Sequence, residues 1–194
     1  MSIFAAAARF FKPSFVKGAD DTAIQRVAAS GWITCKQGHR HWGEDGAAGL
    51  LLLNRGEDGL HVLMQQRGGL ADHGGTWSVP GGARDYFVAG DGERRLGAES
   101  AEAGALRETR EESDLDVGAI RTHDVYSDDH GGWTFDTVIA SIPDRVEVHS
   151  DPSEVLHTRW VPLERVEQLP LHPGFARTWP AVRARAEEAM RTVE

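Results

Sequence analysis

The stretch Arg-Glu-Thr-Arg-Glu-Glu at residues 107–112 is the most informative part of this 194-residue chain. On a helix, at about 100° per residue, Glu108, Glu111 and Glu112 fall on one face, because positions i, i+3 and i+4 are neighbours there. Three crowded carboxylates repel one another, so the stretch predicts a cationic partner for this face. Mg²⁺ and Mn²⁺ bind such hard oxygen ligands and then engage the phosphates of a substrate.

Two other interpretations of the same residues stay open at this point. Arg107 and Arg110 are able to neutralise the carboxylates, although neither is expected to point squarely into their face at that spacing. A charged, solvated helix face is the second alternative. The opposite face carries Ala103, Leu106 and Thr109, which are able to pack.

Residues on both sides of this stretch form a longer pattern, which consists of Pro80-Gly81-Gly82, Glu99, Arg107-Glu108, Glu111-Glu112 and Leu115. The pattern resembles the Nudix box, G-x5-E-x7-R-E-U-x-E-E-x-G-U, where U is aliphatic, and residues 99–115 fit its spacing. Segments outside the box are also similar to the family, and the resemblance covers residues 45 to 170 or so. These segments are Gln65-Gln66-Arg67, His73-Gly74-Gly75, Trp77-Ser78-Val79 and Glu154 with Trp160-Val161-Pro162.

The chain departs from the family pattern at three places. Gly82 and Glu99 are seventeen positions apart where the pattern needs six, so an insertion of eleven residues lies within residues 83–98. Its Gly, Asp and Arg content predicts an exposed, mobile loop that is dispensable for folding. Asp114 replaces the turn glycine, which is tolerable because Asp is accepted in the left-handed region after a helix. Thr109 replaces the aliphatic residue and needs only to pack.

The order of the elements alone indicates a mixed sheet covered by helices, in the α/β class. The Nudix resemblance implies more, an α/β/α sandwich in which the box forms a loop–helix–loop. We expect an N-terminal extension over residues 1–45. A Nudix hydrolase domain over residues 46–194, including the C-terminal helix, should follow it.

The resemblance also implies roles for the box residues. The three glutamates of residues 107–112 are expected to be catalytic and to bind Mg²⁺, with Mn²⁺ as the alternative ion, and Glu112 is the strongest candidate among them. The main-chain carbonyl of Gly81 is expected to be a further metal ligand. Glu99 and Arg107 are expected to support and orient the ligating carboxylates.

Four residues outside the box are candidates with an open alternative each. Glu154 is expected to be a further ligand or the general base, or else an exposed loop acid. Arg67 is expected to contact phosphate or nucleoside, or else to be an ordinary surface arginine. His130 and Trp133 flank two glycines and are able to stack on a base, although Trp133 is equally suited to the core.

Composition narrows the classes of function. A hydrophobic content of 40% is enough for a core. A net charge of −9 argues against nonspecific binding to nucleic acid or to an anionic membrane, but not against a nucleotide bridged by metal ions. The single cysteine, Cys35, excludes an internal disulfide and is typical of a reducing cytosol. No apolar run reaches the length of a membrane span. These features favour a cytoplasmic enzyme with a small-molecule partner and leave a homodimer open.

Hydrophobic patterns predict the remaining elements. Strands are expected over residues 47–53, 61–66, 117–126 and 133–142 and near residues 160–161, with a turn at 57–59 and a loop at 128–132. Helices are expected over residues 5–11, 22–30, 163–169 and 173–191, the last beginning near Pro180.

Cys35, His39 and His41 together suggest a zinc site. Three ligands with no fourth partner in the sequence are a weak signal, and surface or hydrogen-bonded histidines are the more common explanation.

Two functions from different classes follow. The first is a metal-dependent hydrolase of a pyrophosphate bond in a nucleoside diphosphate linked to a group X, most simply a nucleoside triphosphate, with ADP-ribose or a dinucleotide as the alternative. The second is a non-hydrolytic Nudix-like module that binds a nucleotide as a regulator. All four box glutamates are present, which favours the enzyme.

Overall fold

The apolar run that begins at Ala47 forms the central strand of the main sheet. In the computed structural model, which describes residues 15–17, 23–69, 71, 73–90, 92, 94–150 and 155–192, β5 spans Ala47–Gly56. On one side it pairs in parallel with β12 (Thr134–Ser141), and on the other it pairs antiparallel with β6 (Gly59–Arg67). The predicted strand at residues 47–53 and its turn at 57–59 are therefore confirmed.

The main sheet has seven strands, five of them in the order β11–β12–β5–β6–β13. β11 spans Arg121–Asp129 and β13 spans Val155–Pro162. Two short strands lie between the diverging ends of β5 and β6, where β7 (Trp77–Ser78) pairs with β6 and β8 (Gly81–Ala83) pairs with β5. The sheet is mixed, as expected, and the segment from Trp77 to Ala83 lies in its middle.

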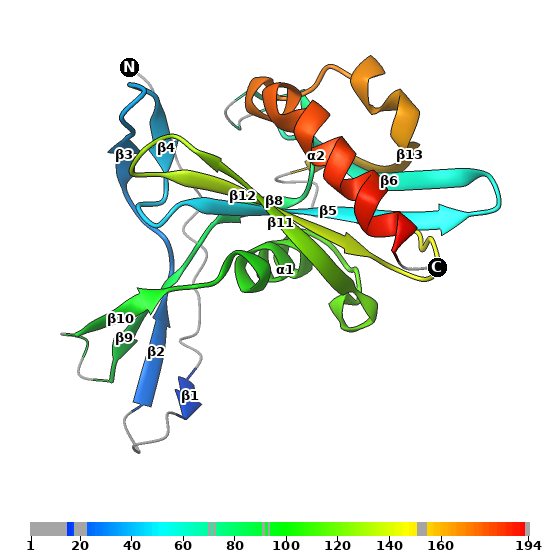
Figure 1. Ribbon diagram of the computed structural model, residues 1–194. Helices are drawn as coiled ribbons and strands as arrows, with labels where there is room; N and C mark the ends of the chain where they lie inside the picture. Colours follow the sequence, from blue (N-terminus) through cyan, green and yellow to red (C-terminus); the bar gives the residue numbers. More distant parts are fainter. Residues whose placement is uncertain are drawn as a thin grey trace.

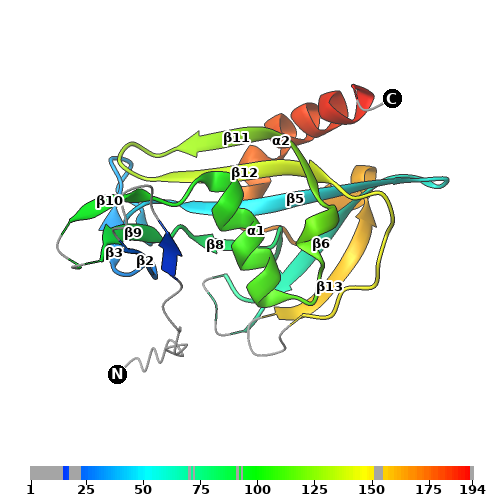
Figure 2. The same cartoon turned by 90° about the horizontal axis from the view of Figure 1, so that it is seen from below.

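The four consecutive leucines of β5 point alternately to the two faces of the sheet, so both faces are apolar. Leu51 and Leu53 belong to one buried cluster and Leu50 and Leu52 to the other, because successive side chains of a strand point to opposite faces. The C-terminal helix α2 (Pro173–Arg191) covers the first face, and α1 (Ala101–Glu112) covers the second. Figures 1 and 2 show the two helices on opposite sides of the sheet. The α/β/α sandwich is confirmed.

The helix expected over residues 173–191 is confirmed as helix α2 with the same bounds. It begins at Pro173, with the ring of His172 accepting a hydrogen bond from the amide of Gly174, and it continues through Pro180. The expected start near Pro180 is wrong, because Phe175 and Trp179 pack on the sheet one turn apart and hold the first turns in place. The short helix after β13 is a 3₁₀ helix at Leu163–Gln168, and another at Val117–Ala119 precedes β11.

The inserted residues form part of a second, four-stranded sheet in the order β1–β2–β9–β10. Its strands are β1 (Phe15–Lys17), β2 (Ala23–Val27), β9 (Tyr86–Ala89) and β10 (Arg95–Ala98). The predicted helix over residues 22–30 is wrong, since that segment finds an edge to pair with in β9, where Ile24 lies opposite Ala89. The helix predicted at residues 5–11 lies outside the described residues.

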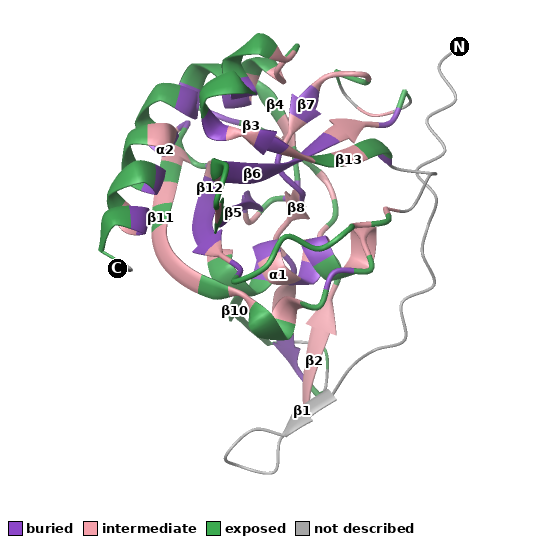
Figure 3. Cartoon of the chain, turned by 90° about the vertical axis from the view of Figure 1, so that its right-hand side faces the viewer, coloured by how far each residue is buried: buried purple, intermediate pink, exposed green. Residues whose placement is uncertain are grey.

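The expectation of an exposed loop within residues 83–98 is also wrong in part. Strand β10 is exposed along its length, as expected (Figure 3). Val88 and Ala89 of β9 are buried. The insertion is a β-hairpin that joins the N-terminal strands to the box. The expected domain boundary at residue 45 stays a prediction.

A third, two-stranded sheet consists of β3 (Trp32–Thr34) and β4 (Arg40–Trp42). Among the residues that the structure describes, no helix is long and apolar enough to span a membrane.

Candidate metal and nucleotide site

Helix α1 carries the three box glutamates and begins at a side-chain cap. Ser100 accepts a hydrogen bond from the amide of Ala103 at 3.1 Å, as an N-cap serine does. Thr109 is fully buried, and its hydroxyl donates to the carbonyl of Ala105, which satisfies the polar atom that replaces the family's aliphatic side chain. Leu106 is half-buried, but Ala103 is exposed, so its expected packing is wrong.

Arg107 lies at the centre of the acidic residues and is buried. Its Nε and Nη2 donate to the carboxylate of Glu99 at 2.9–3.2 Å, and Nη2 also donates to the carbonyl of Ala83. Its Nη1 lies 2.7 Å from a Glu108 oxygen and 3.3 Å from a Glu111 oxygen. The expectation that Arg107 does not reach the carboxylate face is therefore wrong, because Glu99 directs the guanidinium along the helix toward it.

The charges of this cluster shift its pKa values in a consistent way. Burial raises the pKa of Glu108, and the nearby Arg107 opposes that rise. For Arg107, burial alone would lower the pKa, but the hydrogen bonds to Glu99 and the charge of Glu108 outweigh it and raise the pKa. The arginine stays charged, and Glu108 holds a proton more readily than an exposed glutamate does.

The Pro80-Gly81-Gly82 turn brings main chain against the glutamates. A Cβ atom on Gly82 would lie 2.5–2.7 Å from the Glu108 carboxylate, and one on Gly81 would lie 2.4 Å from the carbonyl oxygen of Ala48. At Gly81 the neighbouring atoms belong to the main chain of β5, so only glycine leaves room for β8 at that position. Gly82 is the glycine that lies against the Glu108 carboxylate, and the role of the Gly81 carbonyl as a metal ligand stays a prediction.

The other two box glutamates are held from different elements. Glu112 accepts a hydrogen bond from Gln65 of β6 at 3.1 Å, and Glu111 lies 3.9 Å from the guanidinium of Arg26 in β2. The side chains of Glu108 and Glu111 are 17% and 21% exposed, so they are open to a small ion. Three carboxylates beside a main-chain turn are the hard oxygen donors that Mg²⁺ and Mn²⁺ prefer, so the donor set fits these ions.

Two residues that the sequence did not single out, Asp85 and Arg26, also belong to this cluster. Asp85 is buried and lies 3.4 Å from Arg107 and 3.5 Å from Arg26, so it links the insertion and β2 to the box. No sequence pattern marks this contact, because it depends on the hairpin that the insertion forms.

A pocket lies beside the Pro80-Gly81-Gly82 turn and is lined by residues that are far apart in the sequence, from His41 to Thr178. It contains about 660 Å³ of empty space, part of which is open to solvent. Its lining includes the candidates Arg67, His130 and Trp133, and also Gly81 from the turn. The beginning of α2 contributes further lining residues that the sequence did not single out, including Phe175 and Arg177.

The structure places the two predicted base-stacking residues in the wall of this pocket. Trp133 is buried, its Nε1 donates to the carbonyl of Gly43, and one face of its ring stacks on His41 with centroids 3.8 Å apart. His130 is also buried. Arg67 is half-buried in the same wall, and its neighbour across the sheet is Val155. Glu154, the predicted base or ligand, lies outside the described residues.

Comparison with known proteins identifies the family. Residues 43–182 match the model of the NUDIX domain, so the chain belongs to the Nudix family. The predicted resemblance is therefore confirmed.

Relatives and solved structures agree with this assignment. The chain is 36% identical over 163 residues to a "Nucleoside triphosphate pyrophosphatase/Nudix hydrolase fusion protein" of Bifidobacterium longum, covering 81% of this chain and 32% of that protein. It is 37% identical over 165 residues to a "Putative 8-oxo-dGTP diphosphatase 3" of Mycobacterium tuberculosis, covering 81% of this chain and 70% of that protein. A crystal structure of a Nudix hydrolase from M. smegmatis, RenU, has a TM-score of 0.71 at 33% identity. That match covers 81% of this chain and 95% of the RenU chain.

Proposed function

We propose that the protein is a metal-dependent Nudix pyrophosphohydrolase that cleaves a phosphoanhydride bond of a nucleoside diphosphate linked to X, with a nucleoside triphosphate as the preferred substrate class. The observation that carries this proposal is the cluster of Glu108, Glu111 and Glu112 beside the Pro80-Gly81-Gly82 turn. The names of the two curated relatives, a nucleoside triphosphate pyrophosphatase fusion and a putative 8-oxo-dGTP diphosphatase, support the substrate class.

The box residues have distinct parts in this proposal. Glu108, Glu111 and Glu112 would hold Mg²⁺ or Mn²⁺ together with the Gly81 carbonyl. Such ions, when bound, would neutralise phosphate oxygens and lower the pKa of an attacking water. Arg107, anchored on buried Glu99, keeps the carboxylates of Glu108 and Glu111 oriented toward the same side of the helix.

Residues outside the box would bind the rest of the nucleotide and assist proton transfer. In the pocket, Arg67 supplies positive charge for phosphate, while Trp133 and Phe175 supply aromatic walls for a base. His130 contributes to the wall between them. Glu154 stays our candidate for the general base, since a carboxylate near the attacking water is able to take its proton.

A panel of nucleotides with Mg²⁺ tests the proposal. Nucleoside triphosphates should give a monophosphate and pyrophosphate, and the same reactions in EDTA should give neither. The panel includes 8-oxo-dGTP, ADP-ribose and a dinucleoside polyphosphate, so that the substrate alternatives are compared directly. Nucleotide binding without hydrolysis of any substrate would instead support a non-hydrolytic regulator. A cytoplasmic location and a homodimer stay predictions.

A further inference from the structure

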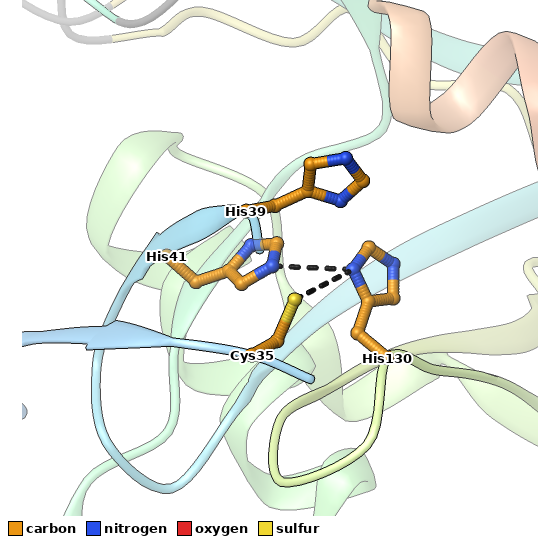
Figure 4. Close-up of side chains that lie close together, drawn as sticks. All are labelled: Cys35, His39, His41 and His130. Atoms are coloured by element: carbon orange, nitrogen blue, oxygen red, sulfur yellow. Dashed lines mark hydrogen bonds between the residues drawn. The ribbon is translucent and has the colours of Figure 1, made fainter. Parts of the chain in front are cut away.

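A second group of potential metal ligands lies on elements other than the box helix. Cys35, His39, His41 and His130 converge, and their ligand atoms all lie within 4.8 Å of one another (Figure 4). The first three come from the β3–β4 hairpin, and His130 comes from the connection between β11 and β12, 89 positions beyond His41. The fourth partner that the sequence lacked near Cys35 is therefore supplied by the fold.

The hairpin turn is shaped to point three of these side chains the same way. The amide of Cys35 donates to the carbonyl of His39 at 3.0 Å, and the amide of Gly38 donates to the carbonyl of Cys35 at 2.9 Å. Gly38 has a φ of +83°, which only glycine adopts readily, and this closes the turn tightly. His39 and His41 are two positions apart in extended chain, so they share a face.

His130 is fixed in the orientation of a metal ligand. Its Nδ1 lies 3.1 Å from Nε2 of His41 and 3.9 Å from Sγ of Cys35, while its Nε2 lies 3.0 Å from an Asp128 oxygen. A carboxylate on the outer nitrogen is the usual partner of a histidine whose other nitrogen binds a metal. Arg177 also contacts Asp128, and its Nη2 lies 2.8 Å from the same Nε2. In the tautomer in which Nδ1 is free to bind a metal, Nε2 carries the proton, and Asp128 is then the shared acceptor for His130 and Arg177.

The two halves of the cluster are held together by other contacts. The amide of Lys36 donates to the carbonyl of Gly131 at 2.9 Å, which joins the hairpin turn to the β11–β12 connection. The stacking of His41 on Trp133 fixes the ring of the second histidine. Cys35 and His130 are buried, His41 is half-buried and His39 is exposed, so the cluster is closed on one side and reached from the other.

We propose that Cys35, His39, His41 and His130 bind one Zn²⁺ in a structural site. Zn²⁺ bonds of about 2.3 Å to sulfur and about 2.0–2.1 Å to nitrogen place tetrahedral ligand atoms about 3.3–3.6 Å apart. The separations of 3.1 Å and 3.9 Å from Nδ1 of His130 lie on either side of that range, and no pair of ligand atoms exceeds 4.8 Å, so the side chains would have to move inward by about 1 Å at most to complete the geometry. A thiolate with three imidazoles suits Zn²⁺ and not Mg²⁺, and four protein ligands leave no open position for catalysis.

The site would stabilise one wall of the nucleotide pocket. His41 and His130 line that pocket as well as the cluster, and Asp128 and Arg177 line it beside them. A metal joining the hairpin to the β11–β12 connection therefore fixes the position of this wall. The proposal concerns a second metal and does not depend on the reaction catalysed at the box.

Metal analysis of the purified protein is the first test. After exchange into buffer with excess Mg²⁺, the wild-type protein should retain about one zinc ion per chain, as expected for the tight binding of structural sites. Cys35→Ser and His39→Ala should lose the ion, and His157→Ala is the matched control because His157 is exposed on β13. No zinc in the wild-type protein, even after refolding with Zn²⁺, would overturn the proposal.

Two further measurements keep the test independent of folding defects. Replacement of Zn²⁺ by Co²⁺ in the wild-type protein should give the intense visible bands of a tetrahedral site and a sulfur-to-cobalt charge-transfer band, and a weak octahedral spectrum would contradict it. Asp128→Asn should lower zinc affinity by about 10–100-fold while retaining the fold. Unchanged zinc affinity in Asp128→Asn and His39→Ala would show that the ion binds elsewhere.

Discussion

At the scale of single residues, the positive charge of one buried arginine, Arg107, partly neutralises the negative charges of several acidic side chains. Arg107 contacts Glu99, Glu108 and Glu111 at once, so the repulsion expected among the box glutamates is partly compensated before any metal binds. Glu112 accepts a hydrogen bond from Gln65 of the sheet, which holds its carboxylate beside those of Glu108 and Glu111. Because Glu112 is the strongest candidate ligand among the three, it is the residue chosen for a test of metal binding.

Glu112→Gln should retain the fold and lose activity by about 10²–10³-fold, because the amide is nearly isosteric but lacks the negative charge. Steady-state hydrolysis of the best nucleotide measures the loss. Glu102→Gln is the matched control, since Glu102 lies on the same helix, is exposed and accepts a hydrogen bond from the Thr122 hydroxyl away from the box glutamates. Parent-like hydrolysis by Glu112→Gln would show that its carboxylate holds no catalytic metal.

Glu108 should make metal-free stability depend on pH. Its pKa is raised in the folded protein from the ordinary value of 4.5, so the folded state binds this proton more tightly than the unfolded chain. Stability contributed by the protonated group is present below the ordinary pKa and is lost as pH rises through the raised one. Glutamine does not titrate, so in EDTA the wild-type protein should lose stability relative to Glu108→Gln as the pH rises from 4.5 through the raised pKa of Glu108. Urea unfolding at a series of pH values measures the free energy of unfolding of the two proteins. If the difference between them does not change with pH, the pKa of Glu108 is not raised in the folded protein.

At the scale of elements, the inserted hairpin is the part that departs most from the family pattern. It supplies Asp85, which contacts Arg107, and β9, which pairs with β2. In the same hairpin β9 is partly buried and β10 is exposed, so the two strands should respond differently to mutation.

Val88→Ala should destabilise the protein by about 1–3 kcal/mol, because it removes buried methyl groups from β9. Leu96→Ala in β10 is the control and should change stability by less than about 0.5 kcal/mol, since its side chain is 42% exposed. Chemical denaturation of the two variants separates these outcomes. Equal, small effects would restore the interpretation of the insertion as a dispensable loop.

The elements that could be predicted were those whose signal is local. The continuous apolar run of residues 47–53 and the spacing of Glu108, Glu111 and Glu112 indicate a buried strand and a helix without reference to other segments. Residues 22–30 were predicted as a helix because nothing local reveals β9 as their partner. The fourth member of the Cys35 cluster, His130, was missed for the same reason. Contacts between distant segments decide these cases.

At the scale of the whole molecule, a net charge of −9 opposes the binding of an anionic nucleotide. Divalent cations should therefore govern affinity as well as turnover. Ca²⁺ accepts longer and looser coordination than Mg²⁺, so it should support nucleotide binding with little cleavage. Calorimetric titration of the preferred nucleotide in Ca²⁺ and in EDTA measures the difference. Equal affinity in both solutions would mean that metal does not bridge the protein and the phosphates.

The position of β5 has a consequence for how the molecule opens. One edge of β5 is paired with β12, and the other is covered in turn by β8, by the carbonyl of Pro80 and by β6. Amide protons of Leu50 to Leu53 should then exchange with deuterium only through global unfolding, more slowly than those of α2. Hydrogen-exchange mass spectrometry resolves the two segments, and faster exchange in β5 would contradict this order. The strand that separates the two helices is thus expected to be the last element to lose its hydrogen bonds.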